Sequence, residues 1–276
     1  MTEKPVITRF APSPTGTLHM GSVRTALFNY LFTKQRNGKS ILRIDDTDKI
    51  RSTKEFEQDI LRGIDWLGFK YDETYHQSER TEIYQKYLTK LVAEDKIYVS
   101  KEVVEKEGDR AEVIRFRNPN KKIKFNDLIK GEIEFDTTEL GDFVVAKDLE
   151  TPLYHFASVV DDYEMGITHV IRGEDHISNT PRQILMWEAI GATLPEFAHL
   201  PMILAQDRTK LSKRKHASIA SLNSFIENGY LSPALVNFVA LLGWSPQSIH
   251  NEETNSNTEI LSLDDLIKLF DISKVQ

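Results

Sequence analysis

The feature that most constrains the fold is the alternation of strand-like and helix-like segments at the start of the chain. Residues 6–10 are β-branched and aromatic, and residues 41–45 form a second apolar run, so both are predicted strands. Apolar residues recur at helical spacing over residues 21–36 and 56–67. The order strand, helix, strand, helix predicts a parallel sheet with right-handed crossovers. Such a sheet binds ligands beyond the C-terminal ends of its strands.

The loop between the first predicted strand and helix has the sequence RFAPSPTGTLHMGS, residues 9–22. Its prolines and Gly16 interrupt regular structure, and the helix starts at Gly21. A helix N-terminus presents unpaired backbone N–H groups and the positive end of the helix dipole, which favour a phosphate. His19 can donate a hydrogen bond to a phosphoryl oxygen as charge builds during substitution at phosphorus. Taken alone, a His-x-Gly sequence is more often a cap or a packing feature.

Changes in sequence pattern divide the chain into four segments. Residues 1–96 contain the first half of the predicted parallel sheet. Residues 97–148 contain short strand-like pieces between charged or glycine turns, which predicts an antiparallel insertion. Residues 149–217 return to alternating helices and strands and form the second half of the sheet. Residues 218–276 are predicted to be mainly helical.

Three details of the later segments can be predicted as well. The sequence HLPMIL, residues 199–204, is expected to form a strand. Thr180 followed by Pro181 is typical of a helix N-cap and first turn. The polar sequence NEETNSNTE, residues 251–259, is expected to be a loop.

Composition excludes several classes of protein. The chain has 276 residues and no cysteine, which excludes disulfides and thiolate metal sites, and its eight histidines show no paired metal-ligand spacing. It has no uncharged apolar run of about 18 residues and no signal-peptide pattern. We therefore expect a cytoplasmic protein with no membrane contact and no bound structural metal. The net charge of −7 argues against nucleic-acid binding over the whole surface but allows a local basic patch.

Two clusters of basic residues stand out. The first contains Arg115, Arg117, Lys121, Lys122, Lys124 and Lys130. The second contains the KLSKR motif, with Lys210, Ser212, Lys213 and Arg214. Each cluster alone is typical of a solvated loop. The KLSKR motif, however, follows a predicted strand of the second half, so it is expected to converge with the His19 loop on one crevice of one sheet.

The sequence around these motifs resembles a known family. HMGS, residues 19–22, and KLSKR, residues 210–214, are similar to the two signature motifs of class I aminoacyl-tRNA synthetases. The following segments are similar, in this order, to glutamyl-tRNA synthetase: RFAPSPTGTLHMGSVRTALFNYLF, LRIDDTD, YHFASVVDDYEMGITHVIRGEDHISNTPRQILMWEAIG, KLSKRKH and NFVALLGWSP. The resemblance implies an α/β fold of the class I synthetase Rossmann type, with a parallel sheet in two halves. An α+β insertion that binds the tRNA acceptor end would interrupt it, and a helical segment would follow.

The resemblance implies a two-step reaction. Glutamate attacks the α-phosphate of ATP, which is accompanied by Mg²⁺, and gives glutamyl-adenylate and pyrophosphate. The acyl group then passes to the 3′-terminal adenosine of tRNA(Glu). The positions that match the ATP-binding and catalytic residues of the family are His19, Gly21, Ser22, Asp175, Ile203, Lys210, Ser212, Lys213 and Arg214.

The resemblance also implies a pocket for glutamate. The matching positions are Arg9, Ala11, Ser13, Asp45, Tyr154, Ser158 and Arg172. The two arginines would pair with carboxylate, and Asp45 would bind the ammonium group. This sequence has Asp45 where the family usually has glutamate, and Ser158 where asparagine is common. The insertion is short and lacks cysteine ligands for zinc; the acceptor end of tRNA is expected at Arg115, Arg117, Lys121, Lys122 and Lys124.

The end of the sequence, LFDISKVQ, falls where the family continues into anticodon-binding domains, so we expect a monomeric catalytic fragment that charges tRNA poorly. Three alternatives stay open. A glutamyl-queuosine tRNA(Asp) synthetase naturally lacks the anticodon domain. A nucleotidyltransferase of the same superfamily would share the His-x-Gly cradle without Arg9, Arg172 and the KLSKR context. A non-catalytic tRNA-binding paralogue would have lost one of the motifs.

Overall fold

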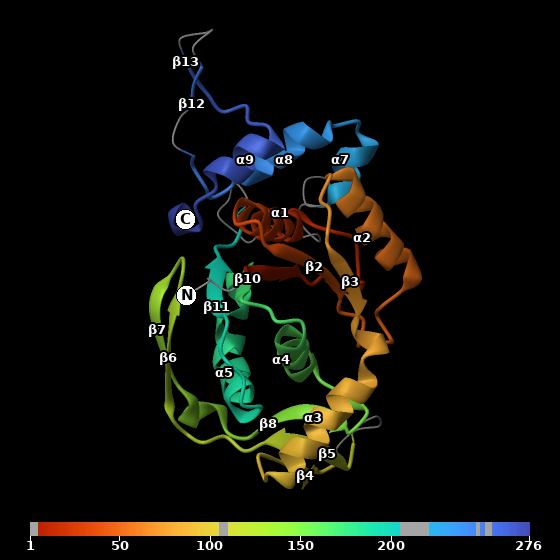
Figure 1. The fold of residues 1–276 in the computed structure, drawn as a ribbon. Coiled ribbons are helices and arrows are strands. Elements are labelled where there is room, and N and C mark those ends of the chain that lie inside the picture. The colour runs from red at the N-terminus through yellow and green to blue at the C-terminus, as the bar shows by residue number, and fades with distance from the viewer. Residues whose placement is uncertain (1–4, 105–109, 205–220, 247–248, 252–255) are drawn as a thin grey trace.

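The computed structural model describes residues 5–104, 110–204, 221–246, 249–251 and 256–276, and Figure 1 shows their arrangement. The KLSKR motif therefore lies outside the described residues.

The first half of the chain forms the predicted alternation. Strands β1 (Ile7–Phe10), β2 (Lys39–Ile44) and β3 (Glu73–His76) pair in parallel in that order. Helices α1 (Met20–Gln35) and α2 (Lys54–Trp66) connect them, and α3 (Thr81–Ala93) follows. The predicted strands and helices are confirmed. Strand β3 was not predicted, because its sequence ETYH contains no run of apolar residues.

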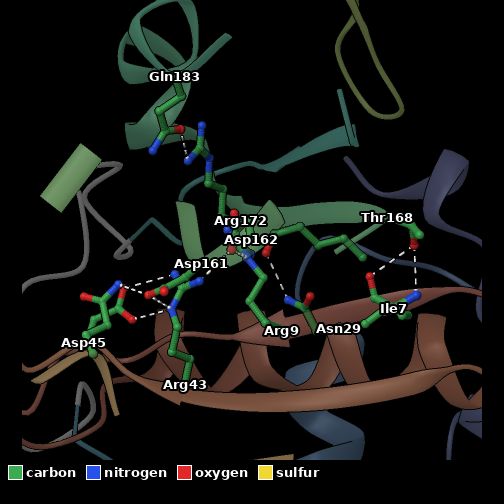
Figure 2. Close-up of polar contacts among 12 residues, drawn as sticks. Ile7, Arg9, Asn29, Arg43, Asp45, Asp161, Asp162, Thr168, Arg172 and Gln183 are labelled. Carbon is green, nitrogen blue, oxygen red and sulfur yellow. Dashed lines mark hydrogen bonds and ion pairs between the residues drawn. The ribbon is translucent and has the colours of Figure 1, made fainter. Parts of the chain in front are cut away.

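The second half forms a second sheet alongside the first. Helix α4 (Tyr154–Glu164) leads into β10 (His169–Gly173), and α5 (Thr180–Ala189) leads into β11 (Glu196–Leu200), which pairs in parallel with β10. Beside β10 lies β1. The backbone N–H of Thr168 donates to the carbonyl of Ile7 at 2.9 Å, and Ile7 N–H donates to Thr168 Oγ1 at 2.8 Å (Figure 2). The two halves thus meet edge to edge, which confirms the parallel sheet in two halves.

The predicted antiparallel insertion is present. Strands β4 (Ile97–Lys101), β5 (Glu112–Phe116), β8 (Phe143–Asp148) and β9 (Thr151–Pro152) pair in that order, each antiparallel to the next. Figure 1 shows this sheet at the end of the molecule opposite to the C-terminal helices.

A hairpin within the insertion belongs to the sheet of the second half instead. Strands β6 (Lys122–Asp127) and β7 (Gly131–Asp136) are antiparallel to each other, and β6 joins the edge of β11 where Asp127 lies opposite Phe197. Sequence analysis did not predict β6. Its residues alternate between exposed and buried, with Ile123, Phe125 and Asp127 inward and the lysines outward. Residues 97–148 therefore do not form one separate sheet.

The C-terminal segment is largely helical, as expected. It contains α7 (Leu222–Glu227), α8 (Ser232–Ala240) and α9 (Leu263–Leu269). The sequence expected to be a polar loop, residues 251–259, contains the short strand β13 (Ser256–Thr258), which pairs with β12 (Ile249–Asn251) at the start of that sequence. Short 3₁₀ turns complete the fold: η1 (Gln77–Glu79), η2 (Thr137–Leu140), η3 (Glu174–Asn179) and η4 (Ile272–Lys274).

Two local predictions in the second half were wrong. The expected strand over residues 199–204 ends at Leu200, because the next residue, Pro201, has no N–H to donate to a neighbouring strand. Thr180 is the first residue of α5, whose N-cap is Asn179. The Thr180 hydroxyl instead bonds to buried side chains, as described below.

Helix α1 is buried on almost every side. Strands β1, β2 and β10 cover one face, and α8 and α9 pack on the other, above α1 in Figure 1. Polar residues of α1 are buried with the apolar ones, and Arg24 bonds to the carbonyls of Pro201 and Leu242. This packing fixes the N-terminus of α1 against the sheet. None of the described helices has both the length and the apolar surface needed to cross a bilayer.

Candidate active site

A cavity of about 570 Å³ lies at the C-terminal ends of β1 and β10 and at the N-terminus of α1. Its wall is formed by residues 9–13, 15–22, 24, 25, 60, 154, 171–173, 175, 176 and 200–203. These residues come from both halves of the sheet. The cavity is therefore at the place where a parallel α/β sheet binds ligands.

The His19 imidazole caps the helix that faces this cavity. Its Nδ1 accepts a hydrogen bond from the backbone N–H of Ser22 at 3.1 Å, and its Nε2 lies 3.0 Å from Ser22 Oγ. A Cβ atom at Gly21 would lie 3.1 Å from two atoms of the ring. Glycine at this position thus leaves room for the imidazole to fold over the first turn. The first turn of α1 contains no acidic residue, so nothing on it opposes the binding of an anion.

Arg172, at the end of β10, is a buried cation in the cavity wall. It is 6% exposed, and its three hydrogen bonds go to neutral groups: Nη1 to Gln183 Oε1 at 2.6 Å, Nη2 to Thr180 Oγ1 at 2.8 Å, and Nε to a histidine. Within the described part of the chain it forms no ion pair. Burial, together with the nearby charge of Arg9, lowers the pKa of Arg172 to about 10. A buried guanidinium without a carboxylate partner favours the binding of an anion beside it.

The histidine that contacts Arg172 is itself held by a carboxylate. His199 Nε2 is 3.2 Å from Arg172 Nε, and His199 Nδ1 is 2.6 Å from Asp127 Oδ2. Both side chains of this histidine–aspartate pair are fully buried. Asp127 comes from β6, so the hairpin contributes to the support of the cavity wall.

Arg9, at the end of β1, belongs to a buried cluster of charges (Figure 2). Asp162 Oδ1 accepts from Arg9 Nε at 2.9 Å and from Arg43 Nη1 at 2.6 Å. Burial opposes the charge on Asp162, but the two guanidinium groups outweigh it and hold its pKa below the ordinary value. Arg80 pairs with the neighbouring Asp161 at 2.6 Å. The cluster fixes the Arg9 guanidinium, and Arg9 is also part of the cavity wall.

Asp45 lies in this cluster and not in the cavity wall. Its carboxylate accepts from Arg43 Nε at 2.7 Å and from Nη2 at 3.3 Å. Burial, with the nearby Asp161 and Asp162, raises the pKa of Asp45 to about 6 against the opposing effect of Arg43. In this structure Asp45 therefore bonds to Arg43, and the predicted contact with an ammonium group would require it to turn.

The structure brings most of the predicted pocket residues together. Ten of them line the cavity: Arg9, Ala11, Ser13, His19, Gly21, Ser22, Tyr154, Arg172, Asp175 and Ile203. Asp45 and Ser158 are buried outside its wall, and the Ser158 hydroxyl has no hydrogen-bond partner among the described residues. Lys210, Ser212, Lys213 and Arg214 lie outside the described residues.

The five basic residues predicted for acceptor binding lie on two different sheets and are all paired with acids. On and after β5, Arg115 pairs with Glu102 and Arg117 with Asp95. On and before β6, Lys121 pairs with Glu188, and Lys122 and Lys124 pair with Glu134. They do not form one continuous, uncompensated basic patch.

Sequence reasoning missed several residues that shape the site. His176 lines the cavity, and Gln183, Thr180, His199 and Asp127 support Arg172. One signal could have found His199: it is a polar residue within an apolar stretch predicted to be a buried strand, where polar groups need partners. Its partner Asp127 is distant in sequence, and only the pairing of β6 with β11 brings the two together.

Comparisons with known proteins agree on one family. The protein-family model described as tRNA synthetases class I (E and Q), catalytic domain, matches residues 5–107 and 100–276. The glutamate--tRNA ligase of Aquifex aeolicus (strain VF5) is 45% identical over 304 residues, which cover 98% of this chain and 62% of that protein. The glutamate--tRNA ligase of Sulfurihydrogenibium sp. (strain YO3AOP1) is 44% identical, covering 97% of this chain and 63% of that protein. The chain thus spans a little under two thirds of these relatives.

Solved structures show the same similarity. A glutamate tRNA ligase from Elizabethkingia meningosepticum CCUG26117, in complex with its amino acid, superposes with a TM-score of 0.88 at 35% identity, covering 99% of this chain and 66% of that one. A putative arginyl tRNA synthetase from Campylobacter jejuni has a TM-score of 0.58 at 16% identity and shares the fold alone.

Proposed function

The chain belongs to the family of class I tRNA synthetase catalytic domains for glutamate and glutamine, and from this membership we propose that it activates L-glutamate with ATP and serves transfer to tRNA(Glu). Glutamate would attack the α-phosphate of ATP, giving glutamyl-adenylate and pyrophosphate. The acyl group would then pass to the 3′-terminal adenosine of the tRNA.

The observation that carries this proposal is the uncompensated charge of Arg172. A buried guanidinium that bonds only to neutral groups stabilises a ligand carboxylate that enters beside it. Arg9, from the neighbouring strand, lines the same cavity. Glutamate carries a side-chain carboxylate that glutamine lacks, so these two cations support a preference for glutamate. Tyr154, Ala11 and Ser13 would complete its pocket.

The N-terminus of α1 would bind the ATP phosphates. Its first-turn residues and His19 lie in the wall of the cavity that also contains Arg172, and Asp175 and Ile203 would contact the adenosine. Lys210, Ser212, Lys213 and Arg214 would steady the leaving pyrophosphate. In support, Ile203 lines the cavity before that segment, and after it Ser221 forms a bridge with His19.

The proposed chemistry needs positioning and charge stabilisation, with no covalent enzyme intermediate. Among the described residues no three His, Cys, Asp or Glu side chains are grouped to hold a metal ion. Mg²⁺ enters the proposal as part of the ATP substrate. Removal of one donor to the developing charge costs about 3 kcal/mol, or two to three decades in rate.

Two further parts of the proposal concern the rest of the molecule. The tRNA acceptor end would contact the insertion, where exposed ion pairs of Lys122 and Lys124 can be exchanged for phosphates at little cost. Residues 1–96, 97–148, 149–217 and 218–276 remain the proposed domains. We also expect a monomer that works in the cytoplasm, where protein synthesis uses its product.

ATP–pyrophosphate exchange tests the proposed function. It should be measured with glutamate, with glutamine and with no amino acid, each with and without tRNA(Glu). We expect exchange that depends on glutamate and on tRNA(Glu). In Arg172→Gln the rate of exchange should fall by about two to three decades. Arg182→Gln, a change of the same kind on α5 but outside the cavity wall, is the control. Exchange without an amino acid, or equal exchange with glutamine, would contradict the proposal.

A further inference from the structure

The support of Arg172 raises the question of how a cation can be held firmly and still remain available to a ligand. A carboxylate bonded directly to Arg172 would orient the guanidinium but would also neutralise it. Such a carboxylate would compete with any anion in the cavity. The structure avoids this competition, because the partners of Arg172 are the neutral groups of His199, Thr180 and Gln183.

The hydrogen bonds fix the protonation state of His199. A guanidinium has N–H donors only, so His199 Nε2 accepts the bond from Arg172 Nε at 3.2 Å, and the Thr180 hydroxyl, 3.1 Å from the same nitrogen, can also donate to it. The proton of the neutral ring must then lie on Nδ1, where it is donated to Asp127 Oδ2 at 2.6 Å. Burial lowers the pKa of His199 below its ordinary value and Arg172 adds to this effect, so the neutral ring is favoured.

Asp127 is bound so that it stays a carboxylate. Its Oδ1 accepts from the backbone N–H groups of Ile129 at 3.0 Å and Lys130 at 2.9 Å, while Oδ2 accepts from His199. Burial opposes its ionisation, but the bonds from His199 and these N–H groups outweigh burial and hold the pKa of Asp127 below its ordinary value. All of its partners are donors, so an ionised Asp127 is the form that fits.

We propose that the buried pair Asp127–His199 is a positioning device that orients Arg172 for a substrate carboxylate without neutralising it. Asp127 fixes the Nδ1–H tautomer, and the tautomer leaves Nε2 as an acceptor for Arg172 Nε. Two of the five guanidinium N–H groups have no partner among the described residues and remain for the substrate. Through this device the β6–β7 hairpin controls affinity for the acidic amino acid. The inference rests on the proposed glutamate site and specifies how that site is built.

Two substitutions test the device by direct binding. Asp127→Asn keeps the shape of the side chain and an oxygen that accepts from the backbone N–H groups, but its amide can donate N–H to His199 Nδ1. This forces the opposite tautomer of His199, in which Nε2–H faces the Nε–H of Arg172. His199→Phe keeps an aromatic ring beside Phe125 and Phe197 but removes the acceptor. Isothermal titration calorimetry with L-glutamate, L-glutamine and ATP should show glutamate affinity falling about tenfold or more in both variants. ATP affinity should change by less than about twofold.

The matched control is Asp136→Asn on β7, whose carboxylate caps an exposed turn at Thr138 and has no bond to the cavity. It should bind glutamate as the unaltered chain does. If the unaltered chain binds no glutamate, the proposed function fails. If it binds glutamate and the two variants bind it equally well, the positioning role fails while the proposed function stands.

Nitrogen NMR of the histidines tests the device without any substitution, and so covers the case in which a variant does not fold. In the unaltered chain His199 should show a protonated Nδ1 and an unprotonated Nε2. A charged ring, or a proton on Nε2, would overturn the proposal. A thermal melt of each variant separates a local change from unfolding, because a folded variant with normal ATP affinity and weak glutamate affinity has lost the orientation of Arg172 alone.

Discussion

Gly21 determines how closely the His19 imidazole can lie against the first turn of α1. A Cβ atom there would come within 3.1 Å of the ring, which would have to shift by a few tenths of an ångström. Alanine is otherwise preferred to glycine within a helix by about 0.5–1 kcal/mol. The same substitution therefore acts on stability and on binding in opposite directions.

We expect Gly21→Ala to leave the melting temperature unchanged or slightly raised and to weaken ATP binding by about tenfold, the effect of losing a hydrogen bond to a charged group. Calorimetric titration with ATP and a thermal melt measure the two effects. Gly63→Ala, in α2, is the control with the opposite pattern, because its Cβ would meet the Leu222 side chain at 2.8 Å. Gly63→Ala should lower the melting temperature and leave the affinity for ATP unchanged. Unchanged ATP affinity in Gly21→Ala would contradict the role of the ring.

Two histidines near the cavity make stability depend on pH. Burial, with nearby arginines, lowers the pKa of His155 and of His176 to about 4. In the unfolded chain both titrate near the ordinary value of about 6.5. Between these values the unfolded state binds more protons, so the free energy of unfolding rises with pH. The contribution of these two histidines to that free energy is lost as pH falls below about 6.5.

His155→Gln should therefore flatten the pH dependence of stability between about pH 7 and 5. Urea unfolding at several pH values gives the free energy of unfolding for both proteins. The difference between them isolates His155, because the other titrating groups are common to both. Parallel curves would show that folding leaves the pKa of His155 unchanged, which would contradict its burial as a neutral ring.

At the level of elements, the β6–β7 hairpin shows what sequence patterns can and cannot predict. Alternation of lysines with Ile123, Phe125 and Asp127 is a strand pattern that was available but was masked by the high charge of the segment. The pairing of β6 with β11 could not be predicted from the sequence, because register between distant strands depends on packing that no local pattern encodes. The strands and helices of the two sheet halves, in contrast, follow directly from their apolar spacing.

The exposed face of this hairpin should contribute to tRNA affinity. Lys124 is paired with Glu134 at 2.9 Å, and its side chain is 59% exposed, so the pair is worth little and can be exchanged for a phosphate. Lys124→Gln should reduce the salt dependence of tRNA(Glu) binding by about one unit of slope, measured by filter binding at several salt concentrations. Lys90→Gln, which removes another exposed, paired lysine on α3, is the control. An identical slope in both variants would exclude Lys124 from the interface.

At the scale of the whole molecule, the buried charge cluster joins the two halves of the chain. Arg9 and Arg43 come from the first half, and Asp162, which binds both, comes from α4 in the second half (Figure 2). Charged groups buried in this way are stable only as a set, since removal of one partner leaves the others without compensation.

Asp162→Asn should lower the free energy of unfolding by about 3–5 kcal/mol, because two buried guanidinium groups lose their shared carboxylate. Urea unfolding measures the loss. Asp48→Asn removes an ion pair with Arg51 that is exposed to solvent, and should cost less than about 1 kcal/mol. Equal losses in the two variants would contradict the role assigned to the cluster.

The candidate site could be predicted from the sequence only in part. His19, Gly21, Arg9 and Arg172 were predicted from motifs and resemblance, and the cavity brings them together. The cluster partner of Asp45 and the support of Arg172 by His199 could not be predicted, because both depend on which side chains meet across the core. The KLSKR motif lies outside the described residues, and its role stays a prediction.

The seam between β1 and β10 has a consequence for biosynthesis. The hydrogen-bonded residues Ile7 and Thr168 are separated by 161 positions. A ribosome adds about 5–20 residues per second, so one edge of β1 waits roughly 8 to 30 s for its neighbour. During that interval the nascent chain exposes an unpaired strand edge, the kind of surface on which chains stick to one another. Chaperones that shield emerging polypeptides should therefore raise the yield of this protein mainly by acting before its second half leaves the exit tunnel.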